Sequence, residues 1–387
     1  MQLTEVNNQT TAQDFILVNV TINKNNPNYI RPLDKDIIDV FDEKKNKTFR
    51  FGKAVRWLLK DNLGNLIGRI AAFTNSKYKN KDDNVPVGGI GFFDCINDHD
   101  AAGMLLNTAK QWLTDQGIQA MDGPINFGER DRWWGLVVEG FQEPIYCMNY
   151  NPPYYQQLFE NYGFKIFYQQ ICLGMNPKQK LSDKIFERHV QFEKDPSYEV
   201  RNIEKDNIEK YAEDFAEVYN EAWAKHGGMK EVKKEQVVQM FKKMKPVMDE
   251  NILWFAYHNK KPIGIFINLP DLNQWFKHLN GQFDLLHKLK FLWVKKTKPC
   301  KKFTGLVFGI IPEYQGKGID AFIVGEAHKT VLRISYTEYE MQWIGDFNPK
   351  MLNIAQGLGD VFQSRKLYTY RYLFDRTKEF KRHPILN

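Results

Sequence analysis

Two distant parts of this chain share one pattern of apolar and polar positions. In each, an apolar run is followed by a short polar turn and then by a second apolar run. The four runs are Ala54–Lys60, Leu66–Phe73, Ile252–His258 and Pro262–Leu269. Runs of this length, separated by turn residues, are typical of β-strands joined as hairpins. The pattern therefore predicts two hairpins far apart in the chain.

The residues after the second hairpin predict alternating strands and helices. One strand is an unbroken apolar run, as expected for a buried central strand. Another alternates strictly, with Glu338 and Glu340 on one face and Tyr339 and Met341 on the other. The predicted elements are the strand Gly305–Ile311, the helix Ala321–Arg333, the strand Tyr336–Ile344, the helix Pro349–Gln356 and the strand Ser364–Phe374. This order predicts a mixed α/β sheet.

The two parts are separated by a constant spacing. Trp57 and Trp254 lie 197 positions apart in the matching hairpins. Asn151 and Asn348 are separated by the same 197 positions, and each precedes a proline that opens a predicted helix. Two separate features at one spacing indicate an internal duplication.

The duplication predicts two tandem domains, at 1–180 and 195–387. The boundary is expected in the polar, proline-containing stretch Asn176–Ser197. Each copy carries its own insertion. The first follows Asp122 and contains Trp133-Trp134, and the second runs from Pro270 to about Lys302.

Charge and cysteine content narrow the choice of partners and compartment. The formal net charge is +7, and seven lysines fall within Lys288–Lys302 without an acid among them. This stretch is interpreted as a solvated loop, with a patch for an anionic partner such as a nucleotide, tRNA or CoA as the alternative. The four cysteines are far apart, and no signal peptide or membrane helix is recognised. We therefore expect a cytoplasmic protein with reduced thiols and no membrane partner.

A glycine loop is the most informative motif. The sequence PEYQGKGID, residues Pro312–Asp320, follows the apolar strand and precedes the predicted helix. Glycines at such a junction let the backbone approach a pyrophosphate, and the helix N-terminus offers free N–H groups. Asp320 stands where an anion would be repelled if its side chain faced the ligand. At the first turn of a helix, however, an aspartate also suits the helix dipole.

With strand, loop and helix in this order, the second copy resembles the GNAT acyltransferases (GCN5-related N-acetyltransferases). Their signature is Gln/Arg-x-x-Gly-x-Gly/Ala, which Gln315 and Gly318 match and Asp320 does not. The whole chain resembles tandem GNAT-like bacterial proteins. The resemblance implies two GNAT-like domains in an α+β mixed sheet. The first copy has no glycine loop and is expected not to bind CoA.

The resemblance also implies the residues that would hold an acyl-CoA. The strand before the loop would line the pantetheine, and the loop would hold the pyrophosphate. The expected residues are Phe308, Gly309, Ile310, Ile311, Gln315, Gly316, Lys317, Gly318, Ile319 and Asp320. No metal is expected.

Catalysis in this family is a direct attack by an amine, so the residues sought are a base and a proton donor. Glu340 is a candidate base, and Asp271 could hold a substrate ammonium or form an ordinary turn at Pro270. The family's usual tyrosine donor, seven residues after the asparagine, is replaced by Ala355 in one copy and Phe159 in the other. Tyr368 and Tyr370 are the substitute donors considered, with Tyr368 taken as the candidate.

Three functions remain open on this basis. The first is an acyl-CoA-dependent N-acyltransferase that acts on a small amine or peptide. The second is an aminoacyl-tRNA-dependent transferase, which Lys288–Lys302 would support only if it lay beside the cleft. The third is a degenerate pair of GNAT domains that binds CoA or a metabolite, or serves as an interaction module.

Overall fold

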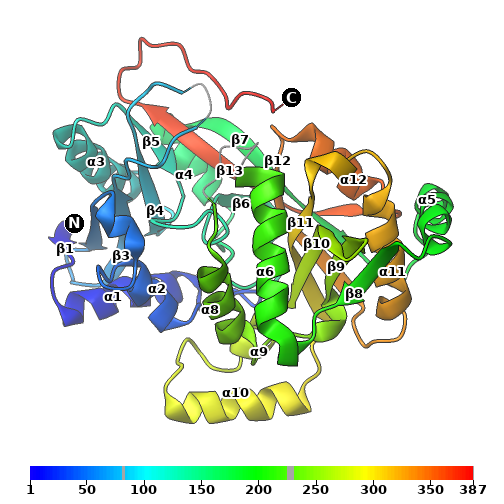
Figure 1. The fold of residues 1–387 in the computed structure, drawn as a ribbon. Coiled ribbons are helices and arrows are strands. Elements are labelled where there is room, and N and C mark those ends of the chain that lie inside the picture. The colour runs from blue at the N-terminus through cyan, green and yellow to red at the C-terminus, as the bar shows by residue number, and fades with distance from the viewer. Residues whose placement is uncertain (81–82, 225–230, 387) are drawn as a thin grey trace.

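The computed structural model of the protein describes residues 1–80, 83–224 and 231–386, and over these ranges 13 strands form one mixed sheet (Figure 1). The strands and helices of the first half are β1 (Gln2–Glu5), α1 (Gln9–Asn23), α2 (Asp34–Val40), β2 (Ala54–Lys60), β3 (Leu66–Phe73), β4 (Val87–Cys95), α3 (His99–Asp115), β5 (Ala120–Gly123), β6 (Leu136–Glu139), α4 (Tyr155–Tyr162), β7 (Lys165–Met175) and α5 (Asp183–Glu193). Those of the second half are β8 (Tyr198–Asn202), α6 (Ile208–Tyr219), η3 (Asn220–Ala224), α8 (Lys234–Met244), β9 (Leu253–His258), β10 (Lys261–Pro270), α9 (Asn273–Phe276), α10 (Leu285–Thr297), β11 (Lys302–Ile310), η5 (Pro312–Tyr314), α11 (Ile319–Val331), β12 (Glu338–Gly345), α12 (Pro349–Gln356) and β13 (Phe362–Leu373).

Both predicted hairpins are present. β2 pairs with β3, and β9 pairs with β10, each antiparallel. The Asp61 carboxylate accepts the backbone N–H groups of Leu63 and Asn65 and so closes the first turn. The second turn uses Asn259 and Lys260 in the left-handed conformation, with φ of 50° and 66°, which is the geometry of a tight hairpin.

Helices cover both faces of the sheet in each half. In the first half, Leu58 packs in a cluster with Phe15 of α1, while the next residue, Leu59, packs in a cluster with Leu105 of α3. Successive strand residues point to opposite faces, so α1 and α3 lie on opposite sides of the sheet. In the second half, α6 and α11 take the corresponding places, since Phe255 contacts a ring of α6 and Gly264 lies against α11.

The two halves exchange their last strands. The order along the sheet is β5-β13-β7-β12, so β13 of the second half pairs with β5 of the first. Likewise, β7 of the first half pairs with β12 of the second. β7 and β13 also pair with one another, from Lys165 to Gly174 on β7. Each half is therefore completed by a strand of the other, whereas the bounds 1–180 and 195–387 stay a prediction.

Two segments differ from their sequence interpretation. The predicted boundary stretch contains the helix α5, which lies beside α11 (Figure 1). The lysine-rich segment was interpreted as a solvated loop, and this is wrong, because its first part forms the helix α10. Lysine and leucine are both good helix formers, and Asp284 caps the helix by accepting the N–H of His287. None of the helices in the described ranges is both long and apolar enough to cross a membrane.

Candidate active site

The candidate site is the gap where β11 and β12 separate. The two strands pair in parallel from Lys302 opposite Glu338 to Gly305 opposite Met341. Beyond that point β11 pairs only with β10, while β12 continues along β7. A cavity of about 810 Å³ occupies the gap, and its lining is mainly apolar. Volumes of this size are typical of small-molecule sites.

The glycine loop leads into α11, whose residues Asp320 and Ala321 line the cavity. Gly316 and Gly318 have φ of 74° and 93°, a conformation that glycine adopts without strain. Gly318 precedes the first residue of α11, and no side chain caps the helix there. The Gln315 side chain donates to the Ile310 carbonyl at 2.8 Å and holds the loop against the strand. The N-terminal N–H groups of α11 are thus oriented toward a possible anion.

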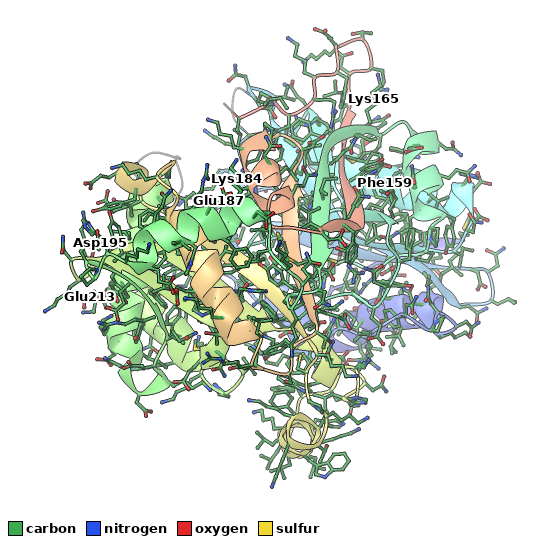
Figure 2. The ribbon with its side chains drawn as sticks, turned by 90° about the vertical axis from the view of Figure 1, so that its right-hand side faces the viewer. Phe159, Lys165, Lys184, Glu187, Asp195 and Glu213 are labelled. Carbon is green, nitrogen blue, oxygen red and sulfur yellow. The ribbon has the colours of Figure 1, made fainter. Side chains whose placement is uncertain are left out.

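Asp320 is half-buried and is among the residues that line the cavity. Two cations of α5 line the same cavity, Lys184 and Arg188. The Arg188 side chain is 3.7 Å from the position that a Cβ would take at Gly318. In the described part of the chain, neither cation has a hydrogen-bond or ion-pair partner. Figure 2 shows α5 across α11, with Lys184 labelled.

The other residues expected to bind the cofactor take different places. Phe308 lines the cavity. Gly309 lies against the ring of Trp223, because a Cβ there would overlap the indole. Ile311 and Ile319 are core residues. The Lys317 ammonium is 5.4 Å from the centre of the Tyr314 ring, on the exposed side of the loop.

The lining of the cavity comes from both halves of the chain. Tyr219 and Trp223 come from α6 and η3, and Arg130 and Asp131 come from the first-half insertion. The insertion therefore forms part of the wall of the cavity. Burial and the nearby charge of Glu129 raise the pKa of Tyr219. Carboxylates of the first half thus stand beside a site built on the second half.

In the first half, the start of α3 takes the place of the start of α11. Asp98 caps α3 by accepting the N–H of Ala101 at 2.8 Å, so a carboxylate occupies the place of an anion. The Tyr155 hydroxyl donates to Asp94 and accepts the N–H of Cys95 at 2.9 Å, which ties α4 to the end of β4. A side chain thus caps this helix start, and that the first half does not bind CoA stays a prediction.

Ala355 lines the cavity and leaves no hydroxyl at the place of the family's tyrosine. The counterpart Phe159 is buried in the core of the first half. A different tyrosine lies in the cavity wall at the point where the strands separate. This is Tyr339, whose hydroxyl a Cβ at Gly305 would overlap. Burial raises its pKa, so it is protonated at neutral pH. The sequence analysis did not single out Tyr339 as a donor, although the alternating pattern of the strand placed it on the face opposite Glu340.

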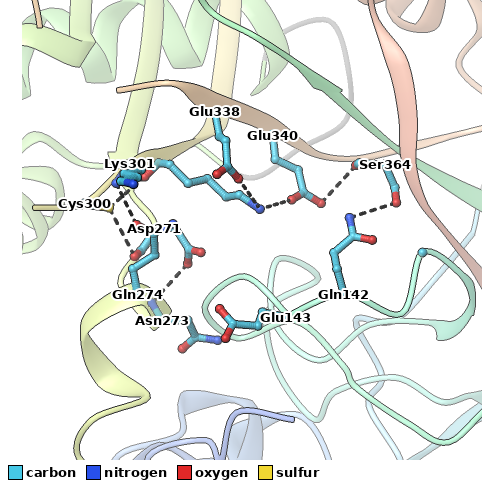
Figure 3. A network of polar contacts seen from close by, with 12 residues as sticks. Gln142, Glu143, Asp271, Asn273, Gln274, Cys300, Lys301, Glu338, Glu340 and Ser364 are labelled. Carbon is cyan, nitrogen blue, oxygen red and sulfur yellow. Dashed lines mark hydrogen bonds and ion pairs between the residues drawn. The ribbon is translucent and has the colours of Figure 1, made fainter. Parts of the chain in front are cut away.

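Glu340 lies in a network of polar contacts and does not line this cavity (Figure 3). It accepts hydrogen bonds from Arg365 Nε at 2.7 Å, Ser364 Oγ at 3.1 Å and Lys302 Nζ at 3.2 Å. Burial alone would raise its pKa, but the two cations hold the pKa below its usual value. A carboxylate so bound is a weak base. This arrangement favours a structural role.

Asp271 lies near Glu340, and both line a second, polar cleft of about 900 Å³. Its carboxylate accepts the backbone N–H groups of Asn273 at 3.1 Å and Tyr146 at 3.2 Å. The first contact is the expected turn, and the second joins it to the first half. Burial raises the pKa of Asp271 to about 6, against the opposing effect of Lys302.

Tyr368 is not brought to either cleft. It stands on β13 opposite Leu136 and Gln169, and its ring is 5.7 Å from that of Tyr370. It packs against the hydrophobic core of the first half. The three residues considered for catalysis are therefore divided between the polar cleft and this core.

One group of possible metal ligands occurs among the described residues, namely His189, Glu193 and Glu326. His189 Nε2 and Glu326 are 2.6 Å apart. The ammonium of Lys329 donates to Glu193 at 2.7 Å and to Glu326 at 2.8 Å. The positive charge between these two carboxylates thus comes from Lys329.

No protein-family model matches the chain. A bacterial ceramide synthase of Caulobacter vibrioides is 23% identical over 360 residues, covering 92% of this chain and 93% of that protein. Protein YghO of Escherichia coli is 22% identical over 375 residues, with 93% of each covered.

Solved structures of GNAT proteins have a similar fold. A tandem GNAT protein from the clavulanic acid biosynthesis pathway superposes with a TM-score of 0.54 at 10% identity, covering 97% of this chain and all of that one. A GCN5-related glucosamine N-acetyltransferase region of a fungal multi-domain β-N-acetylglucosaminidase gives 0.55 at 14% identity, covering 96% of this chain. The chain spans 38% of the length of that fungal protein. The protein has the fold of tandem GCN5-related N-acetyltransferases, as the strand, glycine loop and helix of its second half predict.

Proposed function

We propose that the protein is an acyl-CoA-dependent N-acyltransferase that joins a long acyl chain to the amine of an amphiphilic acceptor. The observation that carries this proposal is the apolar cavity between β11 and β12, which begins beside an uncapped, glycine-led helix N-terminus. A pyrophosphate suits the helix end, and an acyl chain suits the apolar gap. Residues of both halves line the same cavity.

The residues around the start of α11 fit a CoA molecule. Backbone N–H groups at the start of α11 would bind the pyrophosphate, and the edge of β11 around Val307 would align the pantetheine. Asp320 repels an anion at this end, whereas Lys184 and Arg188 line the cavity without a partner in the described ranges. In this proposal the two cations of α5 offset Asp320 and bind phosphate groups of CoA.

The acceptor is proposed from other lining residues of the cavity and from the relatives. The relative from Caulobacter is named a ceramide synthase, and a ceramide is the amide of a fatty acid with a long-chain amine. At 23% identity this likeness supports a class of acceptor and no single compound. Trp223 and Phe266 line the cavity and suit an aliphatic chain, and Asp131 would attract an ammonium group.

The reaction is a direct transfer. The neutral amine attacks the thioester carbonyl, a C–N bond forms, the C–S bond breaks, and the sulfur leaves as a thiolate. The amine loses one proton and the thiolate gains one, so the enzyme has to accept a proton and supply another. We propose Asp131 as the acceptor of the amine's proton and Tyr339 as the donor to the thiolate. Glu340, Asp271 and Tyr368 do not line this cavity and have no role in the proposed step.

A binding module without catalysis is the second candidate, and the absence of a hydroxyl at Ala355 favours it. The aminoacyl-tRNA alternative has less support. None of the lysines between Lys288 and Lys302 is among the described residues that line the cavity.

Calorimetry of the purified protein with acetyl-CoA and palmitoyl-CoA tests the proposal. We expect binding that strengthens with acyl length and is lost in Gly318→Trp. Gly64→Trp is the matched control, since Gly64 also has positive φ, at 84°, and stands in an open turn. Equal binding by the parent and Gly318→Trp would rule out this site. Release of free thiol with long-chain amines then separates the transferase from the binding module.

A further inference from the structure

The helix α10 carries an apolar face that nothing in the described structure covers. It belongs to the insertion of the second half and lies at the lower edge of the molecule, outside the sheet and its covering helices (Figure 1). Figure 2 shows it end-on at the same edge. The exposed large apolar residues of α10 are Leu285, Leu286, Leu289, Leu292 and Trp293. No other helix or strand of the described ranges carries more than two.

The opposite face of α10 holds the helix to the protein. Phe291 and Val294 are buried there. The Phe291 ring packs against the rings of Phe276 and Trp275, at 5.5 Å and 6.0 Å between centres. Trp275 Nε1 also donates to the Lys298 carbonyl at 2.9 Å, just beyond the helix. α10 is thus fixed in place by one face, and its exposed face needs a separate explanation.

The exposed residues form a stripe with lysines on either side. At about 3.6 residues per turn, Leu289 points directly away from the buried face, and Trp293 lies about 40° around the helix from Leu289. Leu286 and Leu292 extend the stripe to its two sides. Lys288 and Lys295 border it on one side and Lys290 on the other. Leu289 is 58% exposed, Trp293 61% and Leu286 74%, so their burial in a partner would release much apolar surface.

The positive charge of this segment favours an anionic partner. From Leu285 to Lys302 every charged side chain is a lysine. A second copy of this chain would bring like charges together across a two-fold interface. An anionic lipid surface instead accepts the leucines and the tryptophan below its headgroups and attracts the lysines at headgroup level. Tryptophan is enriched at that depth, and lysine stems reach back to it.

We propose that α10 docks the protein on an anionic membrane surface, lying in the plane of the interface with Leu286, Leu289 and Trp293 inserted. The helix binds at the surface and does not span the bilayer. This departs from the absence of a membrane partner expected from sequence. It stands on α10 alone and holds whether or not the proposed transferase activity is correct.

Co-sedimentation of the full chain with lipid vesicles tests this directly. The vesicles are phosphatidylcholine alone, or phosphatidylcholine with phosphatidylglycerol. We expect binding to the anionic vesicles that weakens as salt rises, and little binding to the neutral ones. No binding to anionic vesicles at low salt would overturn the proposal. So would a dimer in solution that forms through α10 and excludes vesicles.

Variants on the apolar stripe separate insertion from simple charge attraction. The triple change Leu286→Gln, Leu289→Gln and Trp293→Gln is expected to lower vesicle affinity at least tenfold, because the inserted surface is lost. Leu63→Gln is the matched control, as Leu63 is 88% exposed in the turn between β2 and β3. Since all four positions are exposed, circular dichroism and the unfolding temperature should stay unchanged. Unaltered affinity in the triple variant would contradict insertion.

Variants of the lysines test the charge of the lipid. Changing Lys288, Lys290 and Lys296 to glutamine should weaken binding about fivefold for each lysine removed. Exposed lysines of the first half, Lys24, Lys44 and Lys79, serve as the control set. Equal losses from both sets would show that net charge alone is responsible, and would overturn the assignment to α10.

Lipids brominated on their acyl chains report the depth of Trp293. Bound protein should lose part of its tryptophan fluorescence in these vesicles. The loss should shrink in Trp293→Leu, which keeps an apolar side chain and is therefore expected to bind as the parent does. If quenching is the same in both proteins, Trp293 does not enter the lipid.

Discussion

At the scale of single residues, Arg365 joins the two halves of the molecule. Its side chain is buried, with Nε 2.7 Å from Glu340 of β12. The same guanidinium donates to the carbonyl of Gln142, at 2.8 Å, and to that of Glu143, both in the first-half insertion. A buried carboxylate and the backbone of a distant loop thus share one cation.

Replacement of Arg365 by methionine should destabilise the protein by about 3–5 kcal/mol, because Glu340 would keep a buried charge without its main partner. The double change Arg365→Met with Glu340→Gln should cost less than the single change. Urea unfolding measures both. Lys366→Met is the control, since Lys366 pairs with the exposed Glu139 and surface pairs contribute about 0–1 kcal/mol. Equal costs at positions 365 and 366 would contradict this role.

Asp271 should make stability depend on pH. Burial raises its pKa to about 6 from the ordinary value of 3.8, so the folded state binds the proton more tightly than the unfolded state. The contribution of Asp271 is then fully present below about pH 4 and is lost as the pH rises to about 6. Relative to the parent, Asp271→Asn should gain up to about 3 kcal/mol of stability between pH 4 and 7.

Asp284 should make the stability of the protein depend on pH in the opposite direction. The N–H of His287 and its ring hold the pKa of Asp284 below its ordinary value. Asp284→Asn should therefore lose stability relative to the parent as the pH rises through the acid range. Thermal unfolding from pH 4 to 7 measures both variants. Parallel curves for the parent and Asp271→Asn would show that burial does not perturb this carboxyl.

Tyr339 should matter for turnover and little for binding. Tyr339→Phe keeps the buried ring and removes only the proposed proton donor, so kcat should fall about 10²- to 10⁴-fold. The affinity for acyl-CoA should stay unchanged. Tyr368→Phe is the comparison, since Tyr368 was the donor considered from sequence. Loss of activity in Tyr368→Phe alone would reverse the assignment.

At the scale of elements, α5 and α11 together set the charge at the phosphate end of the cavity. Arg188→Gln should weaken CoA binding about tenfold, as expected for one charge-assisted hydrogen bond. Asp320→Asn should strengthen it, because a negative wall charge is removed. Lys317→Gln is the control, as Lys317 lies on the exposed side of the loop. Titration calorimetry measures the CoA affinity of all three variants. Equal effects of the three changes would indicate only general charge attraction.

At the scale of the whole molecule, the locally encoded parts were predictable from sequence. Turn residues marked both hairpins, and the glycines before α11 marked the loop. The strand exchange could not be foreseen, because β7 and β13 carry similar apolar patterns and either could complete either half. The partner of Glu340 lies 25 residues away on another strand. The lysine-rich pattern of α10 predicted a solvated loop. The exposure of the neighbouring leucines follows only from the fold.

The strand exchange predicts that the two halves unfold together. β13 lies between β5 and β7, which both belong to the first half, so loss of the first half leaves β13 without either neighbour and exposes the second half. Leu58→Ala, at a fully buried position of β2, should cost about 2–5 kcal/mol. Hydrogen exchange should then show the same loss of protection in β12 as in β3. Leu63→Ala, in the adjoining turn, should leave the protection of both strands from exchange unchanged. If β12 keeps its protection while β3 loses it, the halves are independent units despite their shared sheet.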